Sequence, residues 1–416
     1  MKSPPMRRLY HGWRVVAAAF LIALFGWGLG FYGPGIYLMA LEERHGWPGA
    51  EISFAITAYY LAGATLILFG GVAFERLGAR RVVTTGALAM ACGVTLLTLI
   101  RQPWQVYAAF AVMSLGWATM SGAAINVIVA PWFESRRGLA VSLALNGASA
   151  GGVVIAPLII LLMGRLGFCA ALWCAAILML AVVLPTVGLV LRPKRAEEHD
   201  RADASTSEQP YASKEAPLAN SASWRPVMAL DDGRFLTIAI PFALGLTAQV
   251  GFLTHQVAYL SPLLGAVAAG SAVSLTTSAA IVGRVAMGAV VDRIDRRAAA
   301  CANFHLQVIA LGILISATSV PMLYLGCALF GLGVGNMISL PGLIVQQEFP
   351  KGDFARVVSA VVAVNQLTFA FGPALLGVLR QVEGTYATPL LVCLAMQALA
   401  AGIVVVPRLS RVRSRS

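Results

Sequence analysis

Charge is scarce in this sequence. Only 12% of its 416 residues are Asp, Glu, Lys or Arg, and the long apolar runs hold very few of them. Hydrophobic residues make up 59% of the chain. A soluble domain of this length cannot bury so much apolar surface. The composition therefore excludes a soluble protein and predicts an integral membrane protein.

Motifs for metals, disulfides and nucleotides are also lacking. The six cysteines are scattered through apolar runs, with no Cys-x-x-Cys spacing and no Cys/His cluster, which argues against a metal site or a disulfide framework. No Walker-type phosphate loop occurs, so the sequence implies no ATP. Nor do His, Asp, Glu or Cys gather at one depth of the apolar runs, as an intramembrane enzyme would require. We therefore expect no cofactor and no enzymatic activity.

Apolar stretches long enough to cross a membrane make up most of the chain. They predict an all-α membrane protein with twelve transmembrane helices. One long polar segment, rich in Ser, Ala, Glu and Pro, separates two groups of six. We predict a six-helix bundle at 1–191, a cytoplasmic linker at 192–234 and a second six-helix bundle at 235–416. The helices are expected at about 15–40, 52–74, 82–100, 105–131, 139–163, 168–191, 235–259, 266–291, 302–318, 321–346, 357–379 and 386–407.

The basic residues fall mostly on one side of this topology. With the N-terminus in the cytoplasm, the loops on the opposite side hold only Arg44, Arg101, Arg165 and Arg380. Cytoplasmic loops of membrane proteins carry an excess of Lys and Arg. We therefore predict a multi-pass protein of the cytoplasmic (inner) membrane with both termini in the cytoplasm. Topology and membrane lipids account for most of the net charge of +12, and no nucleic-acid partner is implied.

The two halves of the chain resemble each other at a nearly constant offset. The segments "GVAFERLGARR" and "GAVVDRIDRR" begin 217 residues apart, and similar segments begin 219 residues apart at Arg137 and Arg356. In the second pair an asparagine follows the arginine by nine residues, at Asn146 and Asn365. Because six helices are an even number, two such units insert with the same orientation. This is the parallel repeat of a two-bundle transporter, whose substrate site lies near the midplane between the bundles.

The repeated segments resemble a known family. Gly71-x-x-x-Glu75-Arg76-x-Gly78-x-Arg80-Arg81 resembles the loop between the second and third helices of the major facilitator superfamily. Gly288-x-x-x-Asp292-Arg293-x-Asp295-Arg296-Arg297 resembles the echo of that loop in the second half. Glu75 replaces the usual Asp, and Asp295 replaces the usual Gly. The resemblance covers nearly the whole chain and implies the twelve-helix major facilitator fold.

These acidic and basic segments have the chemistry of a latch. An acid at the cytoplasmic end of a helix, with arginines just beyond it, can pair across the bundle interface in one state and release in another. The alternative is that the charges only set the topology. The predicted gating residues are Glu75, Arg76, Arg80, Arg81, Asp292, Arg293 and Arg296.

Other segments resemble the branch that contains monocarboxylate transporters and oxalate–formate antiporters. They are "PWFESRRGLAVSLALNGASAGG" and the opening "HGWRVVAAAFLIALFGWGLGFYGPG". Arg284 matches the eighth-helix arginine with which this branch holds substrate carboxylates. Ala280 and Gly35 stand where the branch has two further charges, and Asn365 and Gln366 are the polar residues where a lysine is expected. These departures argue against a dianionic substrate and against proton coupling through the usual charges.

Arg284 lies deep inside a predicted helix. It precedes Asp292 by eight residues, which places it about 12 Å from the cytoplasmic end of that helix. A charge at that depth is costly and usually faces the bundle interior. The equivalent position in the first half is Ile67, so the shared scaffold does not need a charge there. We favour substrate contact, with a hydrogen bond to backbone carbonyls as the structural alternative.

Further polar and aromatic residues are candidates for the same site. Buried amides in a bundle either bind a ligand or join helices, and the aromatic rings of the first helix either line a cavity or pack against neighbours. His255, near the outer third of the seventh helix, is the candidate for coupling, and an interfacial hydrogen bond is its structural alternative. The predicted substrate-binding residues beside Arg284 are Asn146, Asn365, Gln366, Tyr32, Trp117 and Thr277.

Together these features predict a secondary active transporter that works by alternating access. The substrate is expected to be a small monoanionic carboxylate, carried by symport or antiport, with protons as a candidate coupling ion and the monomer as the working unit. One alternative is a transporter of a neutral or zwitterionic solute, or drug-like efflux, with Arg284 in a gate. A second alternative, from another class, is a non-transporting membrane sensor.

Overall fold

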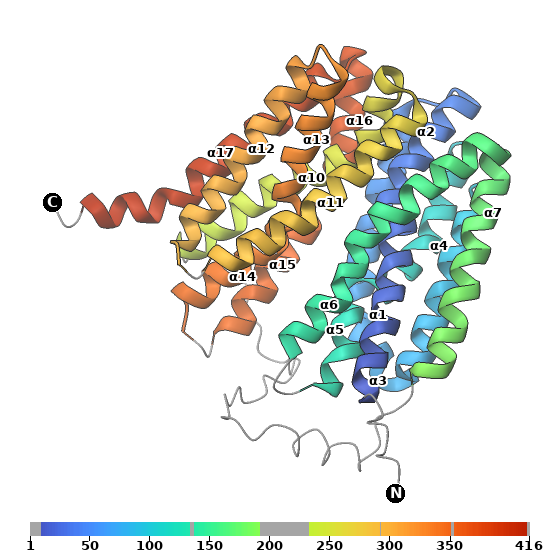
Figure 1. The fold of residues 1–416 in the computed structure, drawn as a ribbon, viewed down its shortest axis with the longest axis horizontal. Helices are drawn as coiled ribbons and strands as arrows, with labels where there is room; N and C mark the ends of the chain where they lie inside the picture. Colours follow the sequence, from blue (N-terminus) through green and yellow to red (C-terminus); the bar gives the residue numbers. More distant parts are fainter. Residues whose placement is uncertain (1–9, 134–136, 192–232, 292, 351–352, 414–416) are drawn as a thin grey trace, which may run out of the picture.

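The structure, a computed structural model, describes residues 10–133, 137–191, 233–291, 293–350 and 353–413. Within these ranges every regular element is a helix. Figure 1 shows two groups of helices side by side, one coloured blue to green and the other yellow to red. The prediction of an all-α fold with two helical bundles is therefore confirmed.

Each group is built from one half of the sequence. The N-terminal group consists of α1 (His11–Trp27), η1 (Gly28–Tyr32), α2 (Gly33–His45), α3 (Gly49–Leu96), α4 (Trp104–Met120), α5 (Gly122–Val129), η2 (Ala130–Trp132), α6 (Arg137–Ala150), η3 (Gly151–Ile155) and α7 (Ala156–Val190). The C-terminal group consists of α10 (Gly233–Leu264), α11 (Ala266–Val290), α12 (Arg296–Ser316), α13 (Val320–Val334), α14 (Asn336–Glu348), α15 (Phe354–Phe369), α16 (Gly372–Glu383) and α17 (Ala387–Arg413).

Two of these helices, α3 and α7, are each interrupted at a glycine. Gly78 in α3 and Gly167 in α7 have φ angles of 77° and 79°, which glycine adopts without the steric cost of a Cβ atom. In the described part of the chain, ten helical stretches are long and apolar enough to cross a membrane. Dividing the two stretches that contain these glycines gives twelve segments, close to the predicted ranges.

The first and fifth membrane segments each contain a π-helical turn. The glycine-rich sequence of the first segment predicts a bend, and η1 lies there between α1 and α2. In the fifth segment, η3 lies between α6 and α7. Glycines let the two turns touch: a Cβ atom added to Gly28 would lie 2.6 Å from Cβ of Ile155. Turns of this kind are frequent at functional sites.

The fourth and tenth segments are broken without a π turn. Ser121, with an extended ψ of 174°, separates α4 from α5. Gly335 keeps helical φ and ψ angles of −65° and −28°, so the break between α13 and α14 is an interruption of the helical hydrogen bonds only. These breaks were not predicted from the sequence. Asp292 and most of the predicted linker lie outside the described residues, and positions 233–234, expected in the linker, already belong to α10.

Candidate functional site

Arg284 lies on α11 and is half-buried. An ideal Cβ atom added to Gly335 would lie 3.1 Å from Nε of Arg284, so the arginine side chain packs against the break between α13 and α14. Arg284 is also close enough to Tyr32 for the two groups to interact electrostatically. Within the described ranges, no carboxylate forms an ion pair with Arg284. The site thus offers a guanidinium whose charge the described residues leave unpaired.

Tyr32 and Thr277 meet beside the π turns. Tyr32 is the last residue of η1 and is 9% exposed, while Thr277, on α11, is 1% exposed. A Cβ atom added to Gly152, in η3, would lie 2.3 Å from Cγ2 of Thr277 and 2.8 Å from the Tyr32 ring. The hydroxyl of Thr277 already donates to the carbonyl of Val273 at 3.0 Å. Three predicted site residues, Arg284, Tyr32 and Thr277, therefore lie at one junction of α11 with the N-terminal bundle.

An aromatic cluster adjoins this junction. The ring centroids of Tyr32 and Phe31 lie 5.2 Å apart, and those of Phe31 and Trp117 lie 6.1 Å apart. Trp117 also meets Trp27 at 5.1 Å, and Tyr60 lies 6.2 Å from both Trp117 and Phe31. The predicted residue Trp117 is 5% exposed and belongs to this cluster.

The three predicted amides, Asn146, Asn365 and Gln366, are not joined to Arg284 by hydrogen bonds in the described part of the chain. Asn146 and Gln366 are half-buried, and Asn365 is 5% exposed. The Oδ1 atom of Asn365 is buried and has no hydrogen-bond partner among the described residues. No hydrogen bond between these three amides and Arg284 is found in the described part of the chain, so their role in binding remains a prediction.

His255 is buried where the two bundles meet. Its Nδ1 atom lies 3.1 Å from the Tyr386 hydroxyl. Its Nε2 atom lies 3.2 Å from Oγ of Ser53 on α3 and 3.0 Å from the Pro373 carbonyl. Both ring nitrogens are therefore engaged, and one of them bridges the bundles.

An ion pair that the sequence reasoning missed lies in the same region. Glu42 on α2 pairs with Arg380 on α16, and the Arg380 guanidinium lies 5.0 Å from the centroid of the Tyr386 ring. A cavity of about 250 Å³ adjoins the pair, lined by Glu42, Gly49, Ala50, Gly377, Arg380, Gln381 and Gly384. The sequence signal was the opposite charge at the ends of the first and eleventh predicted helices, on the side away from the linker.

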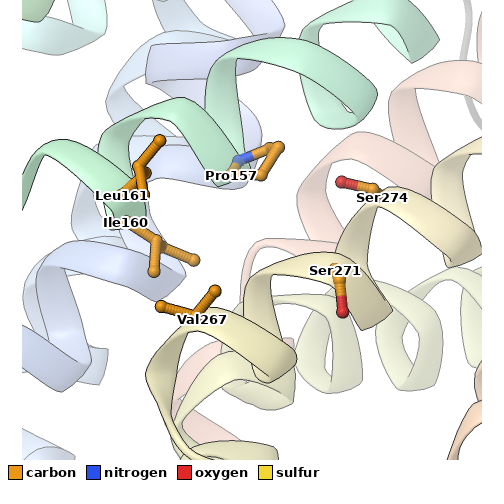
Figure 2. A pocket seen from close by; sticks show the side chains of 6 residues that line it. All are labelled: Pro157, Ile160, Leu161, Val267, Ser271 and Ser274. Atoms are coloured by element: carbon orange, nitrogen blue, oxygen red, sulfur yellow. The ribbon is translucent and has the colours of Figure 1, made fainter. Parts of the chain in front are cut away.

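A second cavity separates α7 from α11 (Figure 2), with a volume of about 240 Å³. Pro157, Ile160, Leu161 and Val267 give it apolar walls. Its serines are already bonded: Ser274 donates to the Val153 carbonyl at 3.2 Å, and Ser271 lies 2.6 Å from the Tyr324 hydroxyl. The lining offers no cation, so this cavity does not suit an anionic ligand.

Direct polar contacts between the bundles cluster away from the predicted linker side. Besides those of Glu42, Ser53 and Ser274, Ser261 donates to the Met39 sulfur, and the backbone N–H of Ala374 donates to the Thr57 hydroxyl at 3.2 Å. Each lies toward the segment ends opposite the linker or near the middle of the fold.

The predicted gating residues have different surroundings. Glu75, Arg76, Arg80, Arg81 and Arg293 are exposed, and Asp292 lies outside the described residues. Arg296 donates to the Leu343 carbonyl and to Gln346, which ties it to α14 of its own bundle.

Arg297 of the second repeated segment was not predicted to form a buried structural clamp. It pairs with Glu348 on α14 through two hydrogen bonds of 2.6 and 2.8 Å and is 4% exposed. It also donates to the carbonyls of Thr237 and Val404. This arginine therefore joins four helices of the C-terminal bundle.

Comparisons with known proteins agree with this architecture. A sequence profile described as Major Facilitator Superfamily matches residues 16–373 and 264–416. Mouse monocarboxylate transporter 11 is 28% identical over 405 residues, which cover 92% of this chain and 84% of that protein. Rat monocarboxylate transporter 13 is 24% identical over 406 residues, covering 95% and 88%.

Other similar proteins have names that indicate different substrates. The fujikurins efflux protein of Gibberella fujikuroi is 24% identical over 370 residues, covering 85% of this chain and 75% of that protein. A crystal structure of the nucleoside transporter NupG has the same fold, with a TM-score of 0.75, 12% identity and coverage of 94% and 98%. The profile spans most of the chain, and the paired bundles have the matching architecture, so the chain belongs to the Major Facilitator Superfamily of membrane transporters.

Proposed function

We propose that this transporter carries a small monoanionic carboxylate, with Arg284 as the group that holds it. The observation that carries the proposal is the half-buried Arg284, which packs on Gly335, interacts electrostatically with Tyr32 and has no carboxylate partner among the described residues. A charge in a membrane interior needs a counter-charge or water. An organic carboxylate would supply the counter-charge and could accept two parallel hydrogen bonds. The similarity to two monocarboxylate transporters supports the same class.

We further propose alternating access as the mechanism. The polar contacts between the bundles lie toward the ends opposite the linker. If the loop charges orient the chain with both termini in the cytoplasm, these contacts close the outer side, and the site at Arg284 communicates with the cytoplasm. Release of Glu42 from Arg380 would then accompany opening to the outside. Glu75 and the loop arginines are proposed to form the corresponding contacts on the cytoplasmic side.

His255 is the proposed coupling residue, and protons are the proposed coupling ion. Its position at the junction of the bundles, with one nitrogen on Ser53 of the other bundle, would link a change in protonation to the closure of the outer side. The protein is proposed to function as a monomer in the cytoplasmic membrane. A cysteine at position 207, in the linker, should react with an impermeant maleimide only from the cytoplasmic side, and one at Gly46 only from outside.

A second candidate is the transport of a larger, drug-like or neutral solute, with Arg284 in a gate. The aromatic cluster around Trp117 could bind such a molecule, and some similar proteins are named as efflux or multidrug resistance proteins. A sensor that binds a solute without moving it is the third alternative.

Counterflow in proteoliposomes separates these functions. Purified protein would be reconstituted with an excess of unlabelled lactate or benzoate inside, and uptake of the same labelled acid would be followed. The corresponding amides serve as neutral controls. We expect exchange of acids and not of amides. Exchange of amides at the same rate would favour the neutral-solute alternative, and binding without exchange would favour the sensor.

A further inference from the structure

The Arg284 side chain packs on the backbone where α13 meets α14. A Cβ atom added to Gly335 would lie 3.1 Å from Nε and 3.2 Å from Cβ of Arg284, so the arginine packs directly on the backbone of the break. Small residues bring α11 and α13 together: a Cβ atom on Gly283 would lie 1.9 Å from the Leu332 carbonyl oxygen. Close approach of this kind depends on residues without side chains. A shift of the backbone at Gly335 would therefore move Arg284.

Two buried asparagines hold the backbone at this break. Nδ2 of Asn336 donates to the Leu332 carbonyl at 3.1 Å and to Oδ1 of Asn303 at 3.0 Å. Nδ2 of Asn303 donates to the Gly333 carbonyl at 3.2 Å. Leu332 and Gly333 belong to the last turn of α13, where carbonyls lose their helical donors. The two side chains therefore supply donors at the place where the helix ends.

The asparagines adjoin a row of buried glutamines. Gln307 follows Asn303 by four residues on α12, and its Nε2 donates to Oε1 of Gln249 at 3.0 Å. Gln397 donates to Oε1 of Gln307 at 2.5 Å and to the Gly245 carbonyl at 3.1 Å. We call Asn303, Asn336, Gln307, Gln249 and Gln397 the amide ladder; each is at most 3% exposed.

The amide ladder fixes its surroundings because its members are buried. A buried amide that loses its partner is left without water to replace it, so the network strongly favours one arrangement. The ladder joins α10, α12, α14 and α17. It therefore ties the break at Gly335 to most of the C-terminal bundle.

The shared scaffold does not require this ladder. The two halves correspond at an offset of 217 to 219 residues, and none of the positions that precede the five amides by that offset holds Asn or Gln. For Asn303 these positions are Thr84, Thr85 and Gly86, and for Gln307 they are Leu88, Ala89 and Met90. The ladder is therefore confined to the half of the chain that contains Arg284. Arg284 shows the same asymmetry, because its counterpart in the first half is Ile67.

We propose that the amide ladder positions Arg284 for its ligand. Asn303 and Asn336 fix the course of the chain at Gly335, and Gly335 provides the surface on which the arginine side chain rests. Gln307, held by the other two glutamines, packs against Gly333 in the same turn. These are positioning residues that act on the substrate through Arg284. That the ladder matters for carboxylate binding rests on the function proposed above. That it positions Arg284 is independent of which ligand the protein binds.

The test uses two variants and a matched control. Asn303→Leu removes the donor to the Gly333 carbonyl and the acceptor of Asn336. Gly335→Ala adds a Cβ atom that would lie 2.7 Å from the Ala280 carbonyl oxygen and 3.1 Å from Nε of Arg284, so α11 and the arginine must both shift. Gln256→Leu removes an equally buried amide of the same bundle, which is bonded to Thr276 and Cys327 and lies outside the ladder. Phenylglyoxal modification of Arg284 in the full-length protein, measured peptide by peptide by mass spectrometry, reports its placement without any ligand. Protection of Arg284 by benzoate or lactate reports binding.

We expect the modification rate of Arg284 to change by about threefold or more in both variants, and to stay close to wild type in Gln256→Leu. We also expect the concentration of acid that protects Arg284 to rise by roughly tenfold, the change expected when one favourable hydrogen bond is lost. If Asn303→Leu fails to fold, Gly335→Ala decides the outcome. Wild-type rates of modification in the folded variants would overturn the positioning proposal. Altered rates without protection by any acid in the wild type would uphold it and reject the proposed carboxylate ligand.

Discussion

Glu42 and Arg380 form an ion pair between the two bundles, although 338 positions separate them in the sequence. The pair is partly buried, with side-chain exposures of 17% and 31%, and the Tyr386 ring packs beside the arginine. Ser53 and His255 bridge the bundles nearby. The contact therefore has the position and chemistry of a latch on the side opposite the linker, which is the outer side in the proposed topology.

Neutralising this pair should favour the state in which the outer side is open. Loss of about 1 kcal/mol from one state changes the ratio of two states roughly fivefold. Ala50 lines the adjacent cavity, so a cysteine at this position in a cysteine-free background can report on its accessibility. In that background, Glu42→Gln should raise the rate at which an impermeant maleimide labels position 50 about fivefold. The exchanged pair Glu42→Arg with Arg380→Glu should restore slow labelling.

The exposed pair of Arg356 and Asp353 provides the control for this experiment. Its partners are three residues apart on one helix, and their side chains are 66% and 41% exposed. Asp353→Asn should therefore leave labelling at position 50 unchanged. Equal labelling of Glu42→Gln and wild type would mean that the ion pair does not hold the outer side closed.

His255 supports a prediction about coupling that is separate from substrate binding. Gln can replace one hydrogen bond of the imidazole but cannot take up a proton near neutral pH. His255→Gln should therefore abolish accumulation driven by a pH gradient while retaining exchange of labelled for unlabelled acid. Both activities can be measured in the same proteoliposomes. Proton-driven accumulation in the variant would remove His255 from the coupling mechanism.

The sequence was sufficient for the fold because apolar length and glycine content are local properties. The all-helical architecture and the irregular turn in the glycine-rich first segment follow from them. The break at Gly335 was missed because glycines inside an apolar helix, here Gly331, Gly333 and Gly335, usually serve close helix packing. The Glu42–Arg380 pair was missed because pairing depends on how the bundles meet, and a sequence without an alignment does not contain that information.

In the candidate site too, local features could be predicted from the sequence and tertiary contacts could not. The depth of Arg284, and its lack of a counterpart at Ile67, could be inferred from the helix length and the repeat. The packing of Arg284 on Gly335 depends on the close approach of α11 to α13, which follows from tertiary packing. Arg297 appeared to be a topology charge like its neighbours, yet it is buried and bonded to Glu348.

The Arg297–Glu348 pair leads to a prediction about stability. Removing one partner of a buried ion pair leaves an uncompensated charge and typically costs about 3–5 kcal/mol. Glu348→Gln should therefore lower the melting temperature of the purified protein clearly. The double variant Arg297→Met with Glu348→Leu should be less destabilised, because apolar residues of similar size leave no buried charge. Equal melting temperatures for wild type and Glu348→Gln would show that the pair is not important for stability.

Arg284 permits a test of charge and geometry separately. Lysine keeps the positive charge but lacks the planar fork that can hold both carboxylate oxygens, so Arg284→Lys should weaken binding of the acid by roughly tenfold or more. Glutamine removes the charge as well, and Arg284→Gln should lose most of the binding, because a charge-assisted hydrogen bond contributes about 1.5–3 kcal/mol. Both variants should remain folded, since no described ion pair depends on Arg284.

The measurement is direct binding of the acid that exchanges best, with melting temperature recorded for each variant. Arg101→Gln, which removes an exposed arginine near the start of α4, is the control for net charge and should bind like the wild type. The order of affinities distinguishes the two roles of Arg284. A carboxylate anchor predicts that wild type binds best, followed by Arg284→Lys and then Arg284→Gln. A gate that does not touch the substrate predicts similar affinities in all three and altered transport rates, and that pattern would replace the anchor by the gate.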